Sequence, residues 1–273
     1  MGKFDGILIV TDLDGTLLKH DQSISKEYVE AIEYFKANGG KFTIVTGRVP
    51  CALAGIDEIV KPNAPLGCVN GGAIYDAEQK KIIWAETADR EILEFIAYID
   101  KEMPTVSHQI NTTEHIWFTK SNDAMDYLRR VSKVENLTCH YSEVTEPILK
   151  ILFADFDLDN MKKVTELIKS HPLIEKYDSV SSEPMYYEVL PKGISKGVAI
   201  PKLCEILGIG IDKTIAVGDN NNDVTMLEVA GLGVAVSNAT ENAKQAADKV
   251  TVSNEESAIA KIIEELDKGI IIL

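Results

Sequence analysis

Short apolar runs and amphipathic stretches alternate along the N-terminal part of the chain. Three apolar runs have the length of buried strands: residues 7–10, 42–45 and 66–69. Between the first two runs, four apolar residues recur at helical spacing: Tyr28, Val29, Ile32 and Phe35. Ser25 is a candidate N-cap for this helix, and Gly39-Gly40 would end it. A second helix is expected over residues 52–59, and strands that alternate with helices indicate a parallel, doubly wound sheet.

The pattern changes near Ile74, where helical and strand patterns become mixed. Strands are expected in five segments, the first two as a hairpin: residues 73–75, 81–84, 107–110, 116–119 and 149–154. Helices are expected in three: residues 92–99, 125–131 and 161–168. This mixture is typical of an inserted α+β domain. The neighbouring aromatics Tyr186 and Tyr187 are interpreted as packing residues rather than as part of a site.

Strand and helix alternate again after Ser195. Helices are expected over residues 197–207, 224–229, 241–247 and 258–266, and strands over residues 214–217 and 232–236. We therefore predict an α/β fold in two domains. A doubly wound parallel-sheet (Rossmann-like) core domain, residues 1–84 and 190–273, is interrupted by an α+β domain, residues 85–189.

Composition is that of a folded globular protein, with 45% hydrophobic and 26% charged residues among 273. No apolar run reaches the roughly 20 residues that span a bilayer, and the N-terminus does not resemble a secretory signal, so we expect a cytoplasmic protein with reduced cysteines. The formal net charge of −15 disfavours nucleic acid and anionic membranes as partners. It also repels phosphorylated metabolites, so a site for them needs its own metal or cations.

Open α/β sheets bind ligands where their strands end, and the first predicted strand ends in Asp12-Leu13-Asp14-Gly15-Thr16. Two carboxylates at this spacing can point at one site, with Gly15 permitting the sharp turn. One could act as a nucleophile while the other transfers a proton, and both offer oxygens to Mg²⁺. The alternative is an ordinary solvated Asp-x-Asp-Gly turn.

Two further segments carry groups that suit an anion. Thr46-Gly47-Arg48 follows the second strand, and its hydroxyl and the backbone N–H beside the glycine suit a phosphate oxygen; the alternative is a helix N-cap followed by a surface arginine. Lys196 stands at a predicted helix start, where its charge opposes the helix dipole, so an anion nearby would explain it. A plain surface lysine is the alternative.

The last such segment is Gly218-Asp219-Asn220-Asn221-Asn222-Asp223, between a predicted strand and a helix. It offers acids and amides at one junction, although a capped helix start would have the same composition. An EF-hand is excluded by the missing glycine and glutamate at their required positions.

In this order, D-x-D-G-T, T-G-R, a late lysine and G-D-x-x-N-D resemble the motifs of the haloacid dehalogenase superfamily over the whole chain. Too few residues separate Asp12 from Thr46 for a helical cap domain, whereas a long insert precedes Lys196. This arrangement is similar to that of the Cof-type phosphatases, which carry a large α+β cap (class IIB). The segment Ser237-Asn238-Ala239 departs slightly, since relatives often have Gly-Asn-Ala there.

The resemblance implies a role for each matching residue. Asp12 would attack phosphorus, and Asp14 would protonate the leaving oxygen and then deprotonate the water. Phosphoryl oxygens would be held by five residues: Leu13, Thr46, Gly47, Lys196 and Asn222. Mg²⁺ would be bound by the Asp12 side chain, the Asp14 backbone carbonyl and Asp219, with Asp223 in support.

The resemblance thus predicts a Mg²⁺-dependent phosphatase of small phosphorylated metabolites, sugar phosphates first, with FMN or pyridoxal phosphate as other candidates. The alternatives are a phosphomutase of the phosphomannomutase type and a non-catalytic phosphosugar-binding protein. We expect a monomer or a small homo-oligomer.

Overall fold

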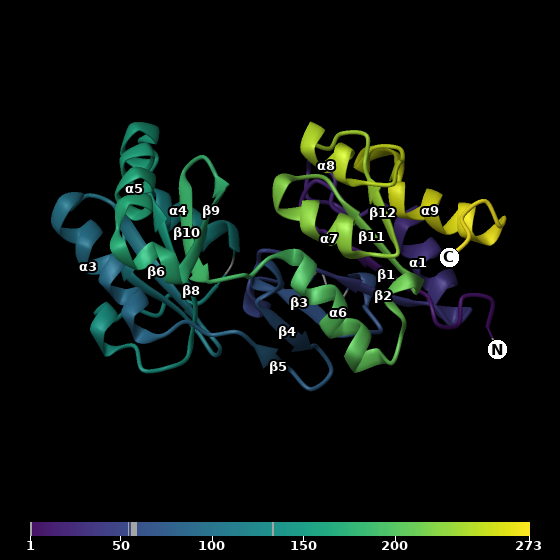
Figure 1. The fold of residues 1–273 in the computed structure, drawn as a ribbon, viewed down its shortest axis with the longest axis horizontal. Coiled ribbons are helices and arrows are strands. Elements are labelled where there is room, and N and C mark those ends of the chain that lie inside the picture. The colour runs from purple at the N-terminus through teal and green to yellow at the C-terminus, as the bar shows by residue number, and fades with distance from the viewer. Residues whose placement is uncertain (1, 54, 56–58, 133) are drawn as a thin grey trace. The chain divides into compact units, whose positions relative to one another are not determined.

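The computed structural model describes residues 2–53, 55, 59–132 and 134–273. The chain divides into two compact units (Figure 1). Met1–Trp84 and Ser195–Leu273 form the first unit, and Ala85–Ile194 forms the second. The sequence pattern put the second boundary after residue 189, whereas the strand there continues to Pro191 and the second unit to Ile194.

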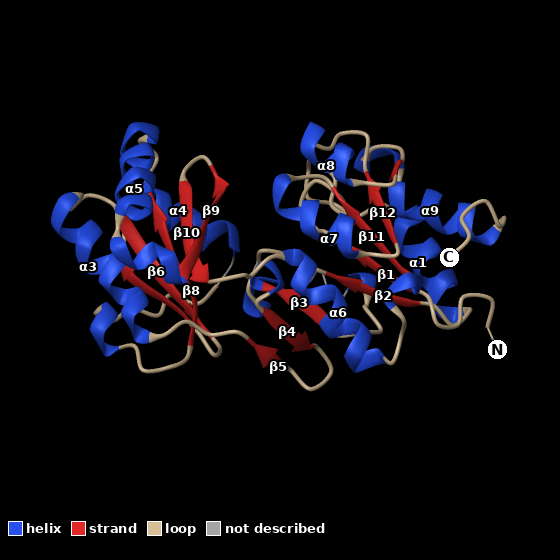
Figure 2. Ribbon diagram, in the orientation of Figure 1, coloured by secondary structure: helices blue, strands red, loops and turns tan. Residues whose placement is uncertain are grey.

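A parallel sheet of five strands forms the centre of the first unit, in the order β13-β12-β11-β1-β2 (Figure 2). Its strands are β1 (Leu8–Thr11), β2 (Lys41–Ile44), β11 (Thr214–Gly218), β12 (Leu232–Ala235) and β13 (Lys249–Val250). Strands from both ends of the sequence are neighbours, because β1 lies between β2 and β11. Every residue of β1 is buried, as expected for a strand covered on both faces.

Helices accompany this sheet in two groups: α1 (Lys26–Ala37) packs on α9 (Ala258–Asp267), and α7 (Val224–Val229) packs between α6 (Lys196–Leu207) and α8 (Glu241–Ala246). Ser25 caps α1, where its hydroxyl oxygen accepts from the Tyr28 N–H. Of the apolar residues at helical spacing, Tyr28, Ile32 and Phe35 are buried and Val29 is partly buried. The predicted doubly wound α/β core is therefore confirmed.

A small antiparallel sheet extends the first unit, in the order β3 (Leu66–Cys68), β4 (Ala73–Asp76) and β5 (Lys81–Ala85). The predicted hairpin forms its β4–β5 half. A parallel bridge between Val45 and Gly67 connects it to the end of β2. Of the helix expected over residues 52–59, the first two residues lie in the 3-10 helix Pro50–Leu53 and residue 59 is helical, while residues 54 and 56–58 lie outside the described part of the chain.

The second unit is an antiparallel sheet of five strands in the order β7-β6-β8-β10-β9, with three α-helices. Its strands are β6 (Ser107–Thr112), β7 (Ile116–Lys120), β8 (Ile148–Ala154), β9 (Tyr177–Glu183) and β10 (Tyr186–Pro191). Its helices are α3 (Leu93–Glu102), α4 (Asp123–Ser132) and α5 (Leu158–Ser170). The predicted α+β insert is confirmed, although β9 and β10 were not separately predicted.

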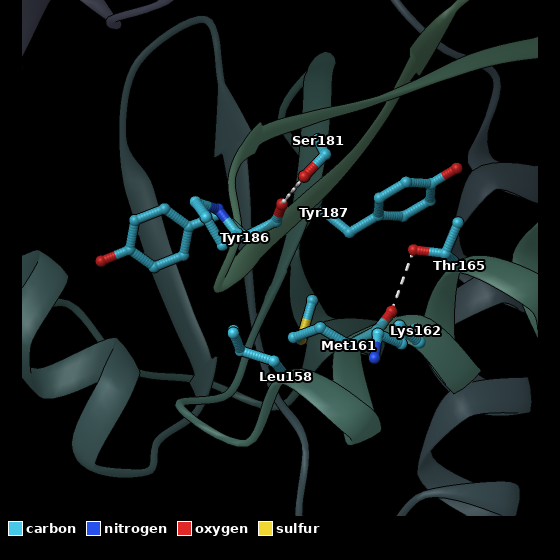
Figure 3. A pocket seen from close by; sticks show the side chains of 8 residues that line it. Leu158, Met161, Lys162, Thr165, Ser181, Tyr186 and Tyr187 are labelled. Carbon is cyan, nitrogen blue, oxygen red and sulfur yellow. Dashed lines mark hydrogen bonds between the residues drawn. The ribbon is translucent and has the colours of Figure 1, made fainter.

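Adjacent positions of β10 place Tyr186 and Tyr187 on opposite faces, as strand geometry requires (Figure 3). Both rings are buried, and Tyr187 belongs to the apolar core of this unit. A pocket lined by both tyrosines, Leu158 and Met161 lies between the start of α5 and the β9–β10 hairpin. In the described part of the chain, no helix is both long and apolar enough to cross a membrane.

Candidate active site

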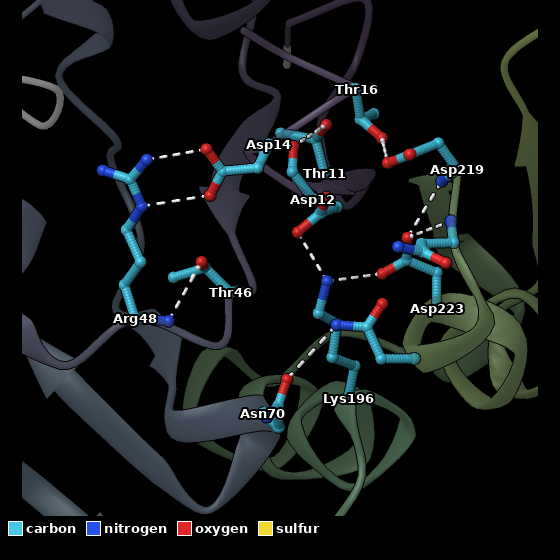
Figure 4. Close-up of polar contacts among 12 residues, drawn as sticks. Thr11, Asp12, Asp14, Thr16, Thr46, Arg48, Asn70, Lys196, Asp219 and Asp223 are labelled. Atoms are coloured by element: carbon cyan, nitrogen blue, oxygen red, sulfur yellow. Dashed lines mark hydrogen bonds and ion pairs between the residues drawn. The ribbon is translucent and has the colours of Figure 1, made fainter. Parts of the chain in front are cut away.

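Parallel pairing of β1 with β11 brings the first and last predicted motifs together. Asp12 directly follows β1, and its N–H donates to the Val217 carbonyl of β11 at 2.8 Å. Asp219 directly follows β11. Because the two strands run in the same direction, both acidic loops lie at one edge of the sheet (Figure 4).

Lys196 connects these two loops through a buried ion-pair network. Its Nζ lies 2.5 Å from Asp12 Oδ1 and 2.5 Å from Asp223 Oδ1. Lys196 is only 2% exposed and Asp12 only 4%. The next residue fixes the start of α6, since the Gly197 N–H donates to Thr225 Oγ1 at 3.1 Å. These two carboxylates are the anions that a lysine at a helix start requires.

A third carboxylate, that of the partly buried Asp219, completes this group. The Thr16 hydroxyl donates to Asp219 Oδ1 at 2.7 Å. Asp12, Asp219 and Asp223 each offer an oxygen within 4.8 Å of the others. Gly15 makes this approach possible: its φ is +84°, and a Cβ there would lie 2.6 Å from Asp219 Oδ2. We call Asp12, Asp219, Asp223 and Lys196 the buried charge cluster.

This cluster carries more negative than positive charge. Burial raises the pKa of Asp12 well above its ordinary value; Lys196 opposes this rise, and the charges of Asp223 and Asp219 add to it. Burial also raises the pKa of Asp219 to about 6, with Thr16 opposing and Asp223 adding to the rise. Burial disfavours charge on Lys196, but its two carboxylate partners outweigh this and hold its pKa above the usual range.

Three carboxylates around one ammonium group fit a divalent cation. Mg²⁺ prefers oxygen ligands, and its positive charge would oppose the effects of burial and of neighbouring carboxylates that raise these pKa values. Asp223 has little remaining capacity to bind a metal ion, because its Oδ2 already accepts from the backbone N–H groups of Asp219 and Asn220, both at 2.9 Å. Asp12 and Asp219 are therefore the better-suited side-chain ligands.

Asp14, the other acid of the first motif, does not share this environment. Its side chain is 49% exposed and faces Arg48 rather than the buried charge cluster. Arg48 donates from Nη2 to Asp14 Oδ1 at 2.6 Å and from Nε to Oδ2 at 3.0 Å. One acid of the motif is thus buried beside a lysine, and the other lies at the surface beside an arginine.

The residues predicted to hold phosphate lie in neighbouring loops. Thr46 is buried, and its Oγ1 accepts from the Arg48 N–H at 3.2 Å. Asn222 donates from Nδ2 to Asn70 Oδ1 at 3.4 Å, and the same oxygen lies 3.0 Å from where a Cβ on Gly47 would be. Leu13 is fully buried between the two acids of its motif. The structure therefore brings the T-G-R loop and the last motif together through Asn70.

Three residues at this site had no predicted role: Thr16, Arg48 and Asn70. Arg48 was expected as a possible surface arginine, and its pairing with Asp14 depends on contacts that sequence spacing does not reveal. Asn70 had a detectable signal, since it begins Asn-Gly-Gly directly after a strand. It adopts the left-handed backbone conformation, with φ 53°, that asparagine tolerates better than most residues.

Comparison with known proteins gives consistent similarities over nearly the whole chain. The family model for haloacid dehalogenase-like hydrolases matches residues 9–263. The chain is 32% identical over 258 residues to the 5-amino-6-(5-phospho-D-ribitylamino)uracil phosphatase YcsE of Bacillus subtilis, covering 94% of each chain. A haloacid dehalogenase-like hydrolase from Bacteroides thetaiotaomicron superimposes with a TM-score of 0.85 at 26% identity, covering 95% of this chain and 99% of that one. The subclass IIB sugar phosphatase BT4131 shares the fold, with a TM-score of 0.81 at 24% identity and coverage of 97% and 100%.

Proposed function

The chain belongs to the haloacid dehalogenase-like hydrolases, as its motifs predicted, and on this premise we propose that it is a Mg²⁺-dependent phosphatase of small phosphorylated metabolites. The observation that carries the proposal is the buried charge cluster at the ends of β1 and β11. It combines a carboxylate nucleophile, a cation for the phosphoryl group and ligands for a metal within one site.

In the first step, a carboxylate oxygen of Asp12 attacks phosphorus, and the bond from phosphorus to the ester oxygen breaks. Asp14 donates its proton to the departing oxygen, so the leaving group departs as an alcohol. The phosphoryl group is then carried on Asp12 as an acyl phosphate. The Lys196 contact at 2.5 Å supports this assignment, because it fixes the orientation of the Asp12 carboxylate.

In the second step, water attacks phosphorus, and the bond between phosphorus and the Asp12 oxygen breaks. Asp14, now ionised, takes a proton from the water, which regenerates both carboxyl groups in their starting states and releases inorganic phosphate. Its half-exposed position supports this double role, since the attacking water must reach it from solvent.

Phosphoryl transfer needs donors and cations around the non-bridging oxygens. We assign this role to Lys196, the Thr46 hydroxyl and the Gly47 N–H, with Leu13 and Asn222 as further contacts. Asn70 links two of the segments that carry these residues, because its N–H donates to the Thr46 carbonyl at 3.0 Å and its Oδ1 accepts from Asn222 Nδ2.

Mg²⁺ would be held by the side chains of Asp12 and Asp219 and the backbone carbonyl of Asp14, with Asp223 in support. When bound, it supplies positive charge that offsets repulsion between the anionic nucleophile and an anionic ester. The raised pKa values of Asp12 and Asp219 support this assignment, because they reflect burial first and the charges of neighbouring carboxylates second, and a bound cation would offset both.

Sugar phosphates are the proposed substrate class. The relative YcsE is named for a substrate that carries a phosphorylated ribityl chain, which supports phosphorylated polyols as the first compounds to test. FMN, which also carries a ribityl phosphate, and pyridoxal phosphate follow. We propose a cytoplasmic protein that acts as a monomer or a small homo-oligomer, with no nucleic-acid or membrane partner.

The test is phosphate release from a panel of these esters, with and without Mg²⁺. Wild type should turn over one or more esters only with the metal. Asp12→Asn should lose at least about a thousandfold in rate, as loss of a covalent nucleophile does elsewhere. Asp123→Asn, an exposed acid in the first turn of α4, is the matched control and should keep wild-type rates.

Two other results would redirect the assignment. Transfer to a second sugar hydroxyl that depends on a bisphosphate activator would identify a phosphomutase. Phosphosugar binding without turnover of any ester would identify a binding protein, and full activity in Asp12→Asn would refute the nucleophile assignment.

A further inference from the structure

The ion pair between Arg48 and Asp14 has bidentate geometry. Two different nitrogens of the guanidinium group donate to the two oxygens of one carboxylate, at 2.6 and 3.0 Å. This two-pronged arrangement fixes the direction of the carboxylate as well as its distance. Gln22 Oε1 also accepts from Arg48 Nη2, at 3.3 Å, which further restricts the guanidinium group.

Both backbones behind this pair are held in place. The Arg48 N–H donates to Thr46 Oγ1, and the Arg48 carbonyl accepts from the Val69 N–H at 2.9 Å. On the other side, the Leu13 carbonyl accepts from the N–H groups of Leu17 and Leu18, which closes the loop that carries Asp14. A change in the pairing of Asp14 therefore requires rotation of side chains only.

The two cations of the site differ in their availability to an incoming anion. Lys196 is buried and already contacts two carboxylates. The Arg48 side chain is 30% exposed, and its charge is offset mainly by Asp14. Guanidinium groups pair with phosphate oxygens in the same two-pronged geometry that they use with carboxylates. An exposed ion pair is weak, so a phosphate ester can compete with Asp14 for Arg48.

We propose that Arg48 is a positioning residue that holds the Asp14 carboxylate turned away from Asp12 until an anionic phosphate ester displaces it. Arg48 then pairs with the ester, and the Asp14 carboxylate is free to rotate toward the reacting oxygen and to take up from solvent water the proton that it delivers. Binding of the substrate and rotation of Asp14 are thereby coupled through the guanidinium group of Arg48. This inference rests on the proposed phosphatase function and extends it to a residue outside the predicted motif roles.

The coupling is tested by a double-mutant cycle on binding of inorganic phosphate, measured by calorimetry in the presence of Mg²⁺. The four proteins are wild type, Asp14→Ala, Arg48→Ala and the double variant. Because Asp14 competes with phosphate for Arg48, Asp14→Ala should tighten phosphate binding by up to about fivefold, the upper range for an exposed pair. In the Arg48→Ala background, the same change should leave the dissociation constant unaltered.

A merely structural role for Arg48 would not produce this non-additivity. If Asp14→Ala tightens binding equally with and without Arg48, general charge repulsion is the cause and the proposal is wrong. It is also wrong if Asp14→Ala has no effect. Arg130→Ala, an exposed arginine of α4, is the control for loss of one positive charge and should leave phosphate affinity unchanged.

The outcomes also separate this inference from the proposed function. An additive cycle in a protein that still binds phosphate and hydrolyses esters overturns only the role of Arg48. If wild type with Mg²⁺ binds no phosphate at all, the proposed function fails and this inference fails with it.

Discussion

Replacing Asp219 with asparagine should stabilise the metal-free protein at neutral pH. Burial, with the nearby charge of Asp223, raises the pKa of Asp219 from 3.8 to about 6. Each pKa unit corresponds to about 1.4 kcal/mol, so the ionised carboxylate costs up to about 3 kcal/mol of folding free energy. Partial contact with solvent reduces this cost, and we expect a gain of about 1–3 kcal/mol in Asp219→Asn. The Thr16 hydroxyl keeps an acceptor, because the amide oxygen can replace Oδ1.

The sign of the pH dependence follows from the direction of this shift. A carboxyl group whose pKa is raised by folding binds more protons in the folded state than in the unfolded state. Its contribution to stability is therefore fully present below about pH 4 and is lost as pH rises through about 6. In wild type without metal, this group makes the free energy of unfolding fall between those values, and Asp219→Asn should lack that component.

Mg²⁺ should narrow this difference in stability. The metal offsets the charge of Asp219 in wild type, where a concentration about 100 times the dissociation constant adds about 2.7 kcal/mol. Asp219→Asn lacks one of the proposed ligands and should gain clearly less. Asp219→Asn is thus expected to be more stable than wild type in EDTA and to gain less unfolding free energy from Mg²⁺.

Urea unfolding followed by far-UV circular dichroism, from pH 4 to 7.5 in EDTA and in Mg²⁺, measures both effects. Asp123→Asn serves again as the exposed control and should reproduce wild type in each condition. The reasoning fails if Asp219→Asn is less stable than wild type in EDTA at pH 7. It also fails if Mg²⁺ stabilises both proteins equally.

Three further predictions follow from the same contacts. Lys196→Met leaves buried carboxylates without their cation and should lower the free energy of unfolding, measured with urea, by about 3–5 kcal/mol. Mg²⁺ should restore part of this stability, and an equal loss with and without the metal would contradict the prediction. Gly15→Ala should cost about 1–2 kcal/mol for the left-handed backbone and should also weaken Mg²⁺ binding in calorimetry, because the new Cβ meets Asp219. Asp14→Asn should slow hydrolysis of alkyl phosphates far more than that of p-nitrophenyl phosphate, whose leaving group needs no proton; equal slowing in initial-rate assays would count against its role as the acid.

Much of the fold follows from local pattern, because the core strands are short, rich in apolar residues and flanked by amphipathic helices. Residues 7–10 illustrate this: a strand buried on both faces has no polar alternation that could be confused with a helix face. The β9–β10 hairpin was harder to predict, since its residues mix serine, glutamate and tyrosine without clean alternation. Their strand conformation depends on pairing, since β10 pairs with β8 and β9 pairs with β10, more than on local preference.

The acids and the lysine of the site could be proposed from sequence because each follows a strand or begins a helix, where backbone geometry alone limits its position. The partner of Asp14, Arg48, could not be predicted from the sequence. Arg48 contacts it through a flexible side chain, and a surface arginine has many reachable acids in a chain with 43 acidic residues. Asn70 lies between these cases, because the Asn-Gly-Gly signal indicates a turn but not which loops that turn connects.

The separation of the two acids has an electrostatic reason. The buried charge cluster already contains three carboxylates and one ammonium group, and burial with mutual repulsion raises the pKa of Asp12 and Asp219. A fourth carboxylate inside it would add a charge that the cluster has no cation to offset. At the surface, Asp14 avoids this cost, pairs with a guanidinium group and has access to water. A group that must give a proton in one step and take one in the next needs such access, so a resting position outside the cluster, from which the side chain can rotate toward the reacting oxygen, suits the proposed chemistry.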